Sequence, residues 1–176
     1  MKLLLLRFID ICLLRSGPQD IPASTALMAL SVFAYCTVGL FSYLVGTSLT
    51  NALLLVGVDI ILLAGLVFVI LWVRMLTTRY VQTLTALTGT GAMLAIISWP
   101  VLYWLQSTTA QPDAGLSLTS PILWIWWIWV LWNLAVVGHI IRYALSTTFF
   151  FGALLSLLYL FISYGVNRVL FYSSAT

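Results

Sequence analysis

The stretch ALLLVGVDIILLAGLVFVILWV, residues 52–73, decides the fold class of this chain. A helix needs about 20 consecutive apolar residues to cross the ~30 Å hydrocarbon core of a bilayer. Residues 52–73 meet that length with a single charged side chain, Asp59, and they end just before Arg74. The stretch therefore predicts a membrane-spanning helix with one acidic residue inside it.

Four further stretches predict spanning helices by the same rule. They are residues 25–45, 84–105, 121–141 and 148–166. The whole chain is 63% hydrophobic and only 6% charged, whereas an ordinary soluble domain has about 25% charged residues. This composition excludes a soluble globular enzyme. We predict an all-α fold, a polytopic membrane helix bundle in which residues 25–166 form one domain of five transmembrane helices.

The N-terminal residues 1–16 are too short and too charged to span a bilayer. On a period of 3.6 residues they place Met1, Leu5, Phe8, Ile9 and Cys12 on one apolar stripe, which predicts an amphipathic helix lying on the cytoplasmic membrane surface. We expect this helix either to anchor the chain or to dock onto another membrane subunit. A linker at residues 17–24 follows it, and residues 167–176 are predicted to form an external tail.

Basic residues predict the orientation, because cytoplasmic loops of membrane proteins carry an excess of Lys and Arg. With a cytoplasmic N-terminus, only Arg168 lies on the external side. The cytoplasmic side holds Lys2, Arg7, Arg15, Arg74, Arg79 and Arg142. Arg7 and Arg15 are candidate contacts to anionic lipid. The basic residues nowhere cluster as a nucleic-acid surface requires, so we expect no nucleic-acid partner and a C-terminus on the external side.

Asp59 is the one charge that this topology does not explain. A charged side chain at the bilayer centre costs at least about 2.5–3.5 kcal/mol on insertion scales, so Asp59 is a candidate functional residue. We expect a structural hydrogen bond within the bundle, a contact to a partner chain, or a proton or ion site. The side chains predicted at a similar depth are Ser98, Tyr103, Asn133, Tyr159 and Ser163.

Three other polar residues lie in the predicted fourth helix and are also candidate functional residues. Asn133 is predicted to add a hydrogen bond between helices. His139 and Arg142 are three residues apart, so they share one helix face near its C-terminus. His139 is the only histidine of the chain. With no second ligand nearby, we predict no metal site and no cofactor.

The fourth helix also carries five of the eight tryptophans, among them Trp124, Trp127 and Trp132. Tryptophan is enriched where a helix meets the membrane surface, so an aromatic belt is one interpretation. The alternative is a groove for a lipid or a quinone-like ligand, because these residues occupy more than one helix face. In either case Trp124, Trp127 and Trp132 are candidate lipid or partner contacts.

Small residues at helical spacing predict close contacts between helices. Gly91 and Ala95 form such a pair in the third helix. Similar contacts are expected at four further glycines, namely Gly57, Gly65, Gly138 and Gly152.

Two segments resemble bacterial members of the Yip1-type membrane family. One is RYVQTLTALTG, residues 79–89, which runs into a Trp99-Pro100 pair, and the other is GHIIRYAL, residues 138–145. The resemblance covers about residues 70–165 and implies a cytoplasmic N-terminus followed by five transmembrane helices. Eukaryotic members carry an acidic-aromatic Gly-Pro motif before the first helix, where this chain has only Gly17-Pro18. Their trafficking role is therefore not carried over.

The sequence lacks catalytic motifs and contains no glutamate, which predicts that the protein is not an enzyme. We expect a membrane protein, of a bacterial inner membrane, that acts through protein or lipid contacts as an accessory or scaffold subunit. Its expected partners are the lipid bilayer and other membrane subunits or further copies of the chain. The alternative is a small transporter or channel component with Asp59 in the pathway. A third hypothesis is a lipid-handling enzyme that uses His139 and Arg142.

Overall fold

The computed structural model describes residues 2–109 and 121–172, and this part of the chain forms six α-helices, two short 3₁₀ turns and no strand. The helices are α1 (Lys2–Cys12), α2 (Thr25–Leu44), α3 (Leu49–Val73), α4 (Tyr80–Thr109), α5 (Pro121–Leu145) and α6 (Phe149–Tyr172), and the 3₁₀ turns are η1 (Pro18–Asp20) and η2 (Thr77–Arg79). Helices α2 to α6 are long and apolar enough to cross a membrane. The all-α fold with five spanning helices is confirmed, and the chain is an integral membrane protein.

Several helix ends differ from their predicted positions. Helix α3 begins at Leu49 rather than at residue 52, α4 begins at Tyr80 rather than at 84, and α5 ends at Leu145 rather than at 141. Helix α6 continues to Tyr172, so the predicted tail at 167–176 begins inside a helix, and α1 ends at Cys12 rather than at residue 16. The predicted bounds followed hydropathy, whereas a helix continues through polar residues as long as its backbone hydrogen bonds are made.

Three helices end on a non-glycine residue in the left-handed conformation: Leu14 (φ 61°), Met75 (φ 57°) and Ser146 (φ 52°). The backbone N–H of the residue that follows then donates a hydrogen bond to the carbonyl oxygen five residues before it. For example, the N–H of Thr147 donates to the carbonyl oxygen of Arg142 at 2.9 Å. Glycine usually occupies this helix-ending position because it has no Cβ to clash. The ends of α1, α3 and α5 therefore lack the residue that commonly marks such a stop in a sequence.

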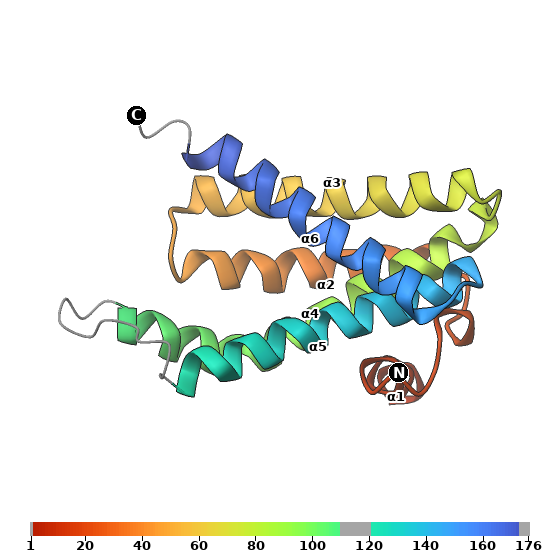
Figure 1. Ribbon diagram of the computed structural model, residues 1–176, viewed down its shortest axis with the longest axis horizontal. Helices are drawn as coiled ribbons and strands as arrows, with labels where there is room; N and C mark the ends of the chain where they lie inside the picture. The colour runs from red at the N-terminus through yellow and green to blue at the C-terminus, as the bar shows by residue number, and fades with distance from the viewer. Residues whose placement is uncertain (1, 110–120, 173–176) are drawn as a thin grey trace.

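Helices α2 to α6 run along the long direction of the molecule, whereas α1 is seen end-on and so lies across them (Figure 1). We call the end that holds α1, η1, η2 and the α5–α6 turn the basic end, and the opposite end the open end. Helices α5 and α6 are joined by residues 146–148 alone, and they pack closely and antiparallel. Helices α4 and α5 diverge from α2 and α3 toward the open end (Figure 1).

The apolar core lies in the half of the bundle next to the basic end. It joins the second halves of α3 and α5 to the first half of α4, and it includes Leu63, Leu71, Leu87, Val136 and Ile140. Four buried threonines of α4 (Thr83, Thr85, Thr88 and Thr90) donate hydrogen bonds to carbonyls four residues earlier. Their hydroxyl groups are thereby satisfied inside the helix, which lets α4 pack centrally among its neighbours.

Two glycines set the close crossing of α5 and α6. A Cβ added to Gly152 would overlap the carbonyl oxygen of Gly138 and lie 3.1 Å from the backbone nitrogen of Arg142. Since these are backbone atoms, no side-chain movement could relieve the overlap. The predicted close contacts at Gly57 and Gly65 are wrong, because a Cβ at either position would meet nothing within 4 Å. Composition alone does not reveal which glycine faces a neighbour.

Helix α1 packs on the side of α4 and α5 through Phe8, Ile11 and Cys12, which are all buried. The Phe8 ring lies where a Cβ on Gly89 would be, so the glycine makes room for it. The residues of the predicted apolar stripe are divided, because Phe8 and Cys12 pack against the bundle while Leu5 and Ile9 are exposed. Burial raises the pKa of the Cys12 thiol to about 11, which keeps it neutral and unreactive at physiological pH.

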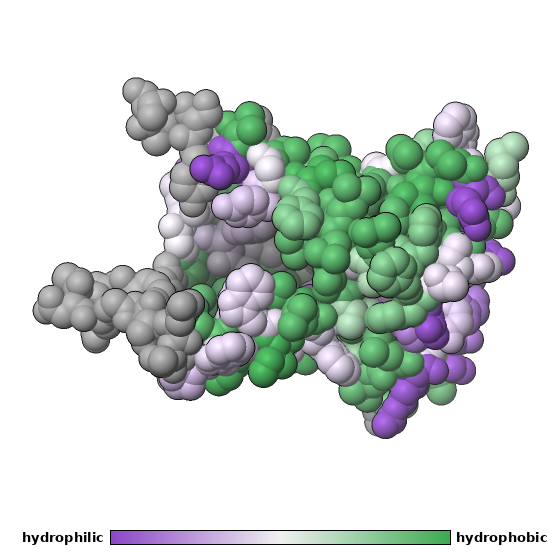
Figure 2. All heavy atoms as spheres, in the orientation of Figure 1, coloured by the Kyte–Doolittle hydropathy of each residue, from purple (hydrophilic) through white to green (hydrophobic). Residues whose placement is uncertain are grey.

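The middle of the molecular surface is mainly hydrophobic, and hydrophilic residues gather at the basic end (Figure 2). Many large apolar side chains of the spanning helices are exposed, including Phe33, Ile61, Phe150 and Phe161. Exposed apolar surface of this extent is what a lipid-facing bundle requires, since lipid tails are as apolar as these side chains. The lipid bilayer is therefore a partner of this chain.

Replacing Gly152 by alanine is expected to lower the free energy of unfolding by about 1–3 kcal/mol, because the added methyl group forces the α5 and α6 backbones apart. Gly65→Ala is the matched control, since its methyl group has open space and alanine favours the helix by about 1 kcal/mol. The measurement is unfolding by denaturing detergent in mixed micelles, followed by circular dichroism. Equal effects of the two substitutions would contradict the close crossing.

Candidate functional site

Asp59 lies in the middle of α3 and accepts hydrogen bonds from two neighbouring helices. The hydroxyl of Tyr35 on α2 donates to one carboxylate oxygen at 2.6 Å, and the hydroxyl of Tyr159 on α6 donates to the other at 2.6 Å. Ser163 Oγ, one turn further along α6, adds a longer bond of 3.4 Å. These two distances are at the short end of the 2.5–3.0 Å range for O–H···O hydrogen bonds. We call these four residues the Asp59 cluster.

The geometry of the helices explains why these residues meet. Tyr35 lies nine residues before the end of α2 at Leu44, and Asp59 lies ten residues after the start of α3 at Leu49. The α2–α3 hairpin therefore places them at the same depth. Gly91 of α4 completes the arrangement, because a Cβ there would come within 2.7 Å of the Tyr35 ring.

Two of the predicted partners of Asp59 are confirmed, namely Tyr159 and Ser163. Three others make no hydrogen bond to it. Ser98 donates to the carbonyl of Ala95, Asn133 donates to the carbonyl of Trp129, and Tyr103 is 73% exposed on the surface. Tyr35 was missed, since counting outward from the predicted spans places Val38 opposite Asp59, and Tyr35 lies about one helical turn from Val38.

The Asp59 cluster borders two adjoining cavities. The smaller has a volume of about 420 Å³ and is lined by Asp59 itself, and the larger has a volume of about 600 Å³. Side chains shared by both walls show that the cavities adjoin: Tyr35, Tyr43, Ala95, Ser98 and Trp126. Asp59 is half-buried as a residue and lines the smaller cavity, while its carboxylate accepts the hydrogen bonds of the cluster.

A third cavity, of about 720 Å³, continues from the larger one toward the open end and shares Tyr43, Tyr164 and Asn167 with it. Thr47, Asn51 and the exposed Arg168 line its outer part. Figure 2 shows the surface hollowed at this end of the molecule. The buried side-chain oxygen of Asn167 has no hydrogen-bond partner among the described residues. The three cavities therefore lie next to one another between the open end and Asp59, and each shares lining residues with the next.

The tryptophans of α5 divide between these cavities and the outer surface. Trp126 and Trp129 line the larger cavity, together with Asn133. The three tryptophans singled out in the sequence lie on the outside instead, since Trp124, Trp127 and Trp132 are all exposed. Their contact with lipid or a partner stays a prediction. Of the five tryptophans on which the predicted ligand groove rested, two, Trp126 and Trp129, line a cavity.

At the basic end, His139 and Arg142 do not point into a shared site. His139 is buried, and its Nε2 lies 3.1 Å from the carbonyl oxygen of Ser16, to which it donates. The Arg142 guanidinium donates to the Tyr143 hydroxyl at 3.1 Å and lies over the rings of Tyr143 and Phe149. His139 therefore holds the segment between α1 and η1 against α5, which sequence reasoning did not foresee.

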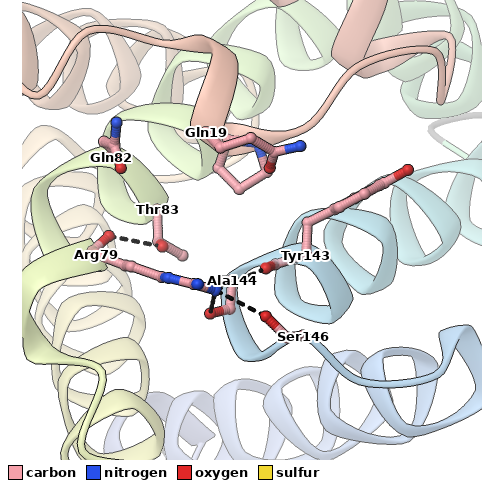
Figure 3. A pocket seen from close by; sticks show the side chains of 8 residues that line it. Gln19, Arg79, Gln82, Thr83, Tyr143, Ala144 and Ser146 are labelled. Carbon is pink, nitrogen blue, oxygen red and sulfur yellow. Dashed lines mark hydrogen bonds between the residues drawn. The ribbon is translucent and has the colours of Figure 1, made fainter.

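Arg79 makes the main polar contacts between η2 and the end of α5 (Figure 3). Its Nη1 donates to the carbonyls of Tyr143 at 3.3 Å and Ala144 at 3.0 Å, and to Ser146 Oγ at 2.9 Å. A cation at these carbonyls is favoured by the negative end of the helix dipole. Next to it, the Gln82 side chain donates to the Ile21 carbonyl at 2.9 Å. A small cavity of about 280 Å³ lies between these contacts.

No group of three potential metal-ligating side chains occurs in residues 2–109 and 121–172. Cys12 and Cys36 are both free thiols. The arrangement at Asp59 offers one carboxylate, several hydroxyl groups and aromatic walls. It is suited to binding a solute rather than to a metal-assisted reaction.

Comparison with known proteins finds no family model, no curated protein and no solved structure that matches the chain. The resemblance to the Yip1-type family therefore stays a prediction. Any function of the chain has to be argued from its own site, because the helix-bundle fold does not imply one.

Arg79→Gln is expected to lower the free energy of unfolding by about 1.5–3 kcal/mol, the range for hydrogen bonds to a charged group. Arg74→Gln is the matched control, since Arg74 is exposed, carries the same charge and lies in the same connection. Replacing Arg74 is expected to change the free energy of unfolding by no more than about 0.5 kcal/mol. Denaturing-detergent titrations of both variants measure the difference. Similar losses would show that charge, and not the contact with α5, is responsible.

Proposed function

We propose that this integral membrane protein is a small transporter or channel component that binds a solute in the cavities beside Asp59. The observation that carries the proposal is the half-buried Asp59, which lines the innermost of three neighbouring cavities that extend toward the open end. This observation favours the transporter alternative over an accessory or scaffold subunit. A scaffold has no need of an acidic residue that lines a cavity.

The free-energy cost of placing a charged Asp59 side chain in the bilayer supports a functional role for this residue. A charge in the bilayer interior is unfavourable, and such residues characteristically border a solute pathway or a wet cavity. Tyr35 and Tyr159 each donate one hydrogen bond to the carboxylate, yet a carboxylate has about four sites that can accept hydrogen bonds. The cluster fixes the position of the carboxylate and leaves part of it available to a ligand.

For the orientation, we propose that the basic end faces the cytoplasm and the open end faces the outside. Arg7, Arg15, Arg74, Arg79 and Arg142 belong to segments at the basic end, and cytoplasmic ends are enriched in such residues. The exposed apolar side chains of α1, among them Leu3, Leu6 and Leu13, then enter the cytoplasmic leaflet. Five helices leave little room for a complete pathway in one copy, so transport would need an oligomer.

Water access to the cavity is testable with single cysteines in a variant whose Cys12 and Cys36 are replaced by alanine. Asn133→Cys places the thiol on the cavity wall. Ile61→Cys places it on the outer, lipid-facing surface, two residues from Asp59, where the Ile61 side chain is 71% exposed. Thiols react as thiolates, which form in water and not in lipid. We expect a membrane-impermeant thiol reagent to modify Asn133→Cys at least about tenfold faster than Ile61→Cys, and only from the open-end side of sealed vesicles.

If Asn133→Cys reacts no faster than Ile61→Cys from either side, the cavity is closed to water and the proposed function fails. Reaction from the basic-end side alone would also contradict it, because the route would then open at the wrong end. Labelling of detergent-unfolded protein shows that both thiols are intact and provides the reference rate.

A further inference from the structure

We infer that the Asp59 cavities bind a monovalent organic cation with an apolar body. This inference rests on the proposed function and names the class of solute. It follows from three features of the cavities: the single negative charge, the aromatic walls and the volume.

The single negative charge of Asp59 indicates that the ligand is a cation with one positive charge. Asp59 is the one acidic residue in the spanning helices of the described chain, and no ion pair is formed by it there. Its neighbours Tyr35, Tyr159 and Ser163 are uncharged donors. A cation in this low-dielectric setting would be attracted far more strongly than in water. One carboxylate matches one positive charge.

The walls favour an organic cation over a metal ion. Ca²⁺ takes six to eight oxygen ligands and Mg²⁺ near-ideal octahedral coordination, whereas the cavities offer one carboxylate and no cluster of potential ligands in the described chain. Six aromatic side chains line the two cavities: Tyr35, Tyr43, Trp126, Trp129, Tyr159 and Tyr164. Aromatic faces attract organic cations through their negative ring faces, and a ligand that leaves water gains most from this attraction.

The volumes set the size of the ligand. The two cavities next to Asp59 measure about 600 Å³ and 420 Å³, within the range of about 300–1,000 Å³ found for small-molecule sites. A bare ammonium ion would fill little of this space. A cation with aromatic or aliphatic substituents would place its charge at Asp59 and its apolar groups against Trp126 and Trp129.

Arg168 lines the outermost of the three cavities, at the open end. Its positive charge opposes the entry of cations, although exposure to water and salt weakens this repulsion. The arrangement predicts that Arg168→Gln raises the affinity for a cation, most clearly at low ionic strength. An anion site would show the opposite change.

The experiment compares tetraphenylphosphonium, a cation, with tetraphenylborate, an anion of nearly the same shape and hydrophobicity. Binding of each radiolabelled ion to the purified protein in lipid nanodiscs is measured against empty nanodiscs, which corrects for partition into lipid. We expect saturable binding of the cation only. Asp59→Asn, which keeps the shape of the side chain and removes its charge, is expected to weaken this binding by about tenfold or more.

Because Asp59→Asn also alters the cluster, a second pair of variants keeps the test decisive. Trp126→Leu removes an aromatic face from the cavity, and Trp127→Leu removes one from the outer surface. We expect only Trp126→Leu to weaken cation binding, by about three- to tenfold, the effect of one desolvated cation–π contact.

Equal saturable binding of both ions, or equal effects of the two tryptophan variants, would overturn the cation inference. Absence of binding would also overturn it if Asn133→Cys is modified from the open-end side. In that case the cavity is a solute route for another class of ligand. If Asn133→Cys is not modified, the proposed function itself fails, so the two failures are distinguishable.

Discussion

The carboxylate of Asp59, which two tyrosine hydroxyls approach to 2.6 Å, joins three of the five spanning helices. A bilayer offers no water to satisfy a buried polar group, so Asp59 needs partners from within the bundle. Tyr35 brings α2 to α3, and Tyr159 brings α6 to α3. The two tyrosines also line the cavities next to Asp59. The residues that hold these helices together therefore also form part of the candidate site.

The two ends of the bundle differ in how polar groups are used. At the basic end, Arg79, Gln82 and His139 each donate hydrogen bonds to backbone carbonyls of other segments, and these contacts attach the N-terminal linker and the α5–α6 turn to the bundle. The apolar core lies in the same half. At the open end, polar residues such as Asn167 line cavities instead. A closed, packed half and an open, hollow half are consistent with solute entry from one side only.

Sequence reasoning found the five spans and the separate N-terminal helix, because length and hydropathy alone decide which segments can cross a bilayer. It also anticipated that Asp59 makes hydrogen bonds within the bundle. It identified Tyr159 and Ser163 by depth. It did not identify which side of a spanning helix faces the interior of the bundle. Trp126 and Trp129 line the cavity while Trp124, Trp127 and Trp132 do not. Lipid and protein interior are both apolar, so the hydropathy of a spanning helix does not reveal its inner face.

By itself, the sequence determined that this is a polytopic helical membrane protein with one unexplained acidic residue, since a long run of apolar side chains can avoid water in no other way. Only the tertiary structure decided which glycines allow close crossing, where the helices end next to left-handed residues such as Ser146, and that neighbouring cavities lie between Asp59 and one end. These features depend on which side chains from distant segments meet. The packing of five helices in three dimensions settles that, and local composition does not encode it.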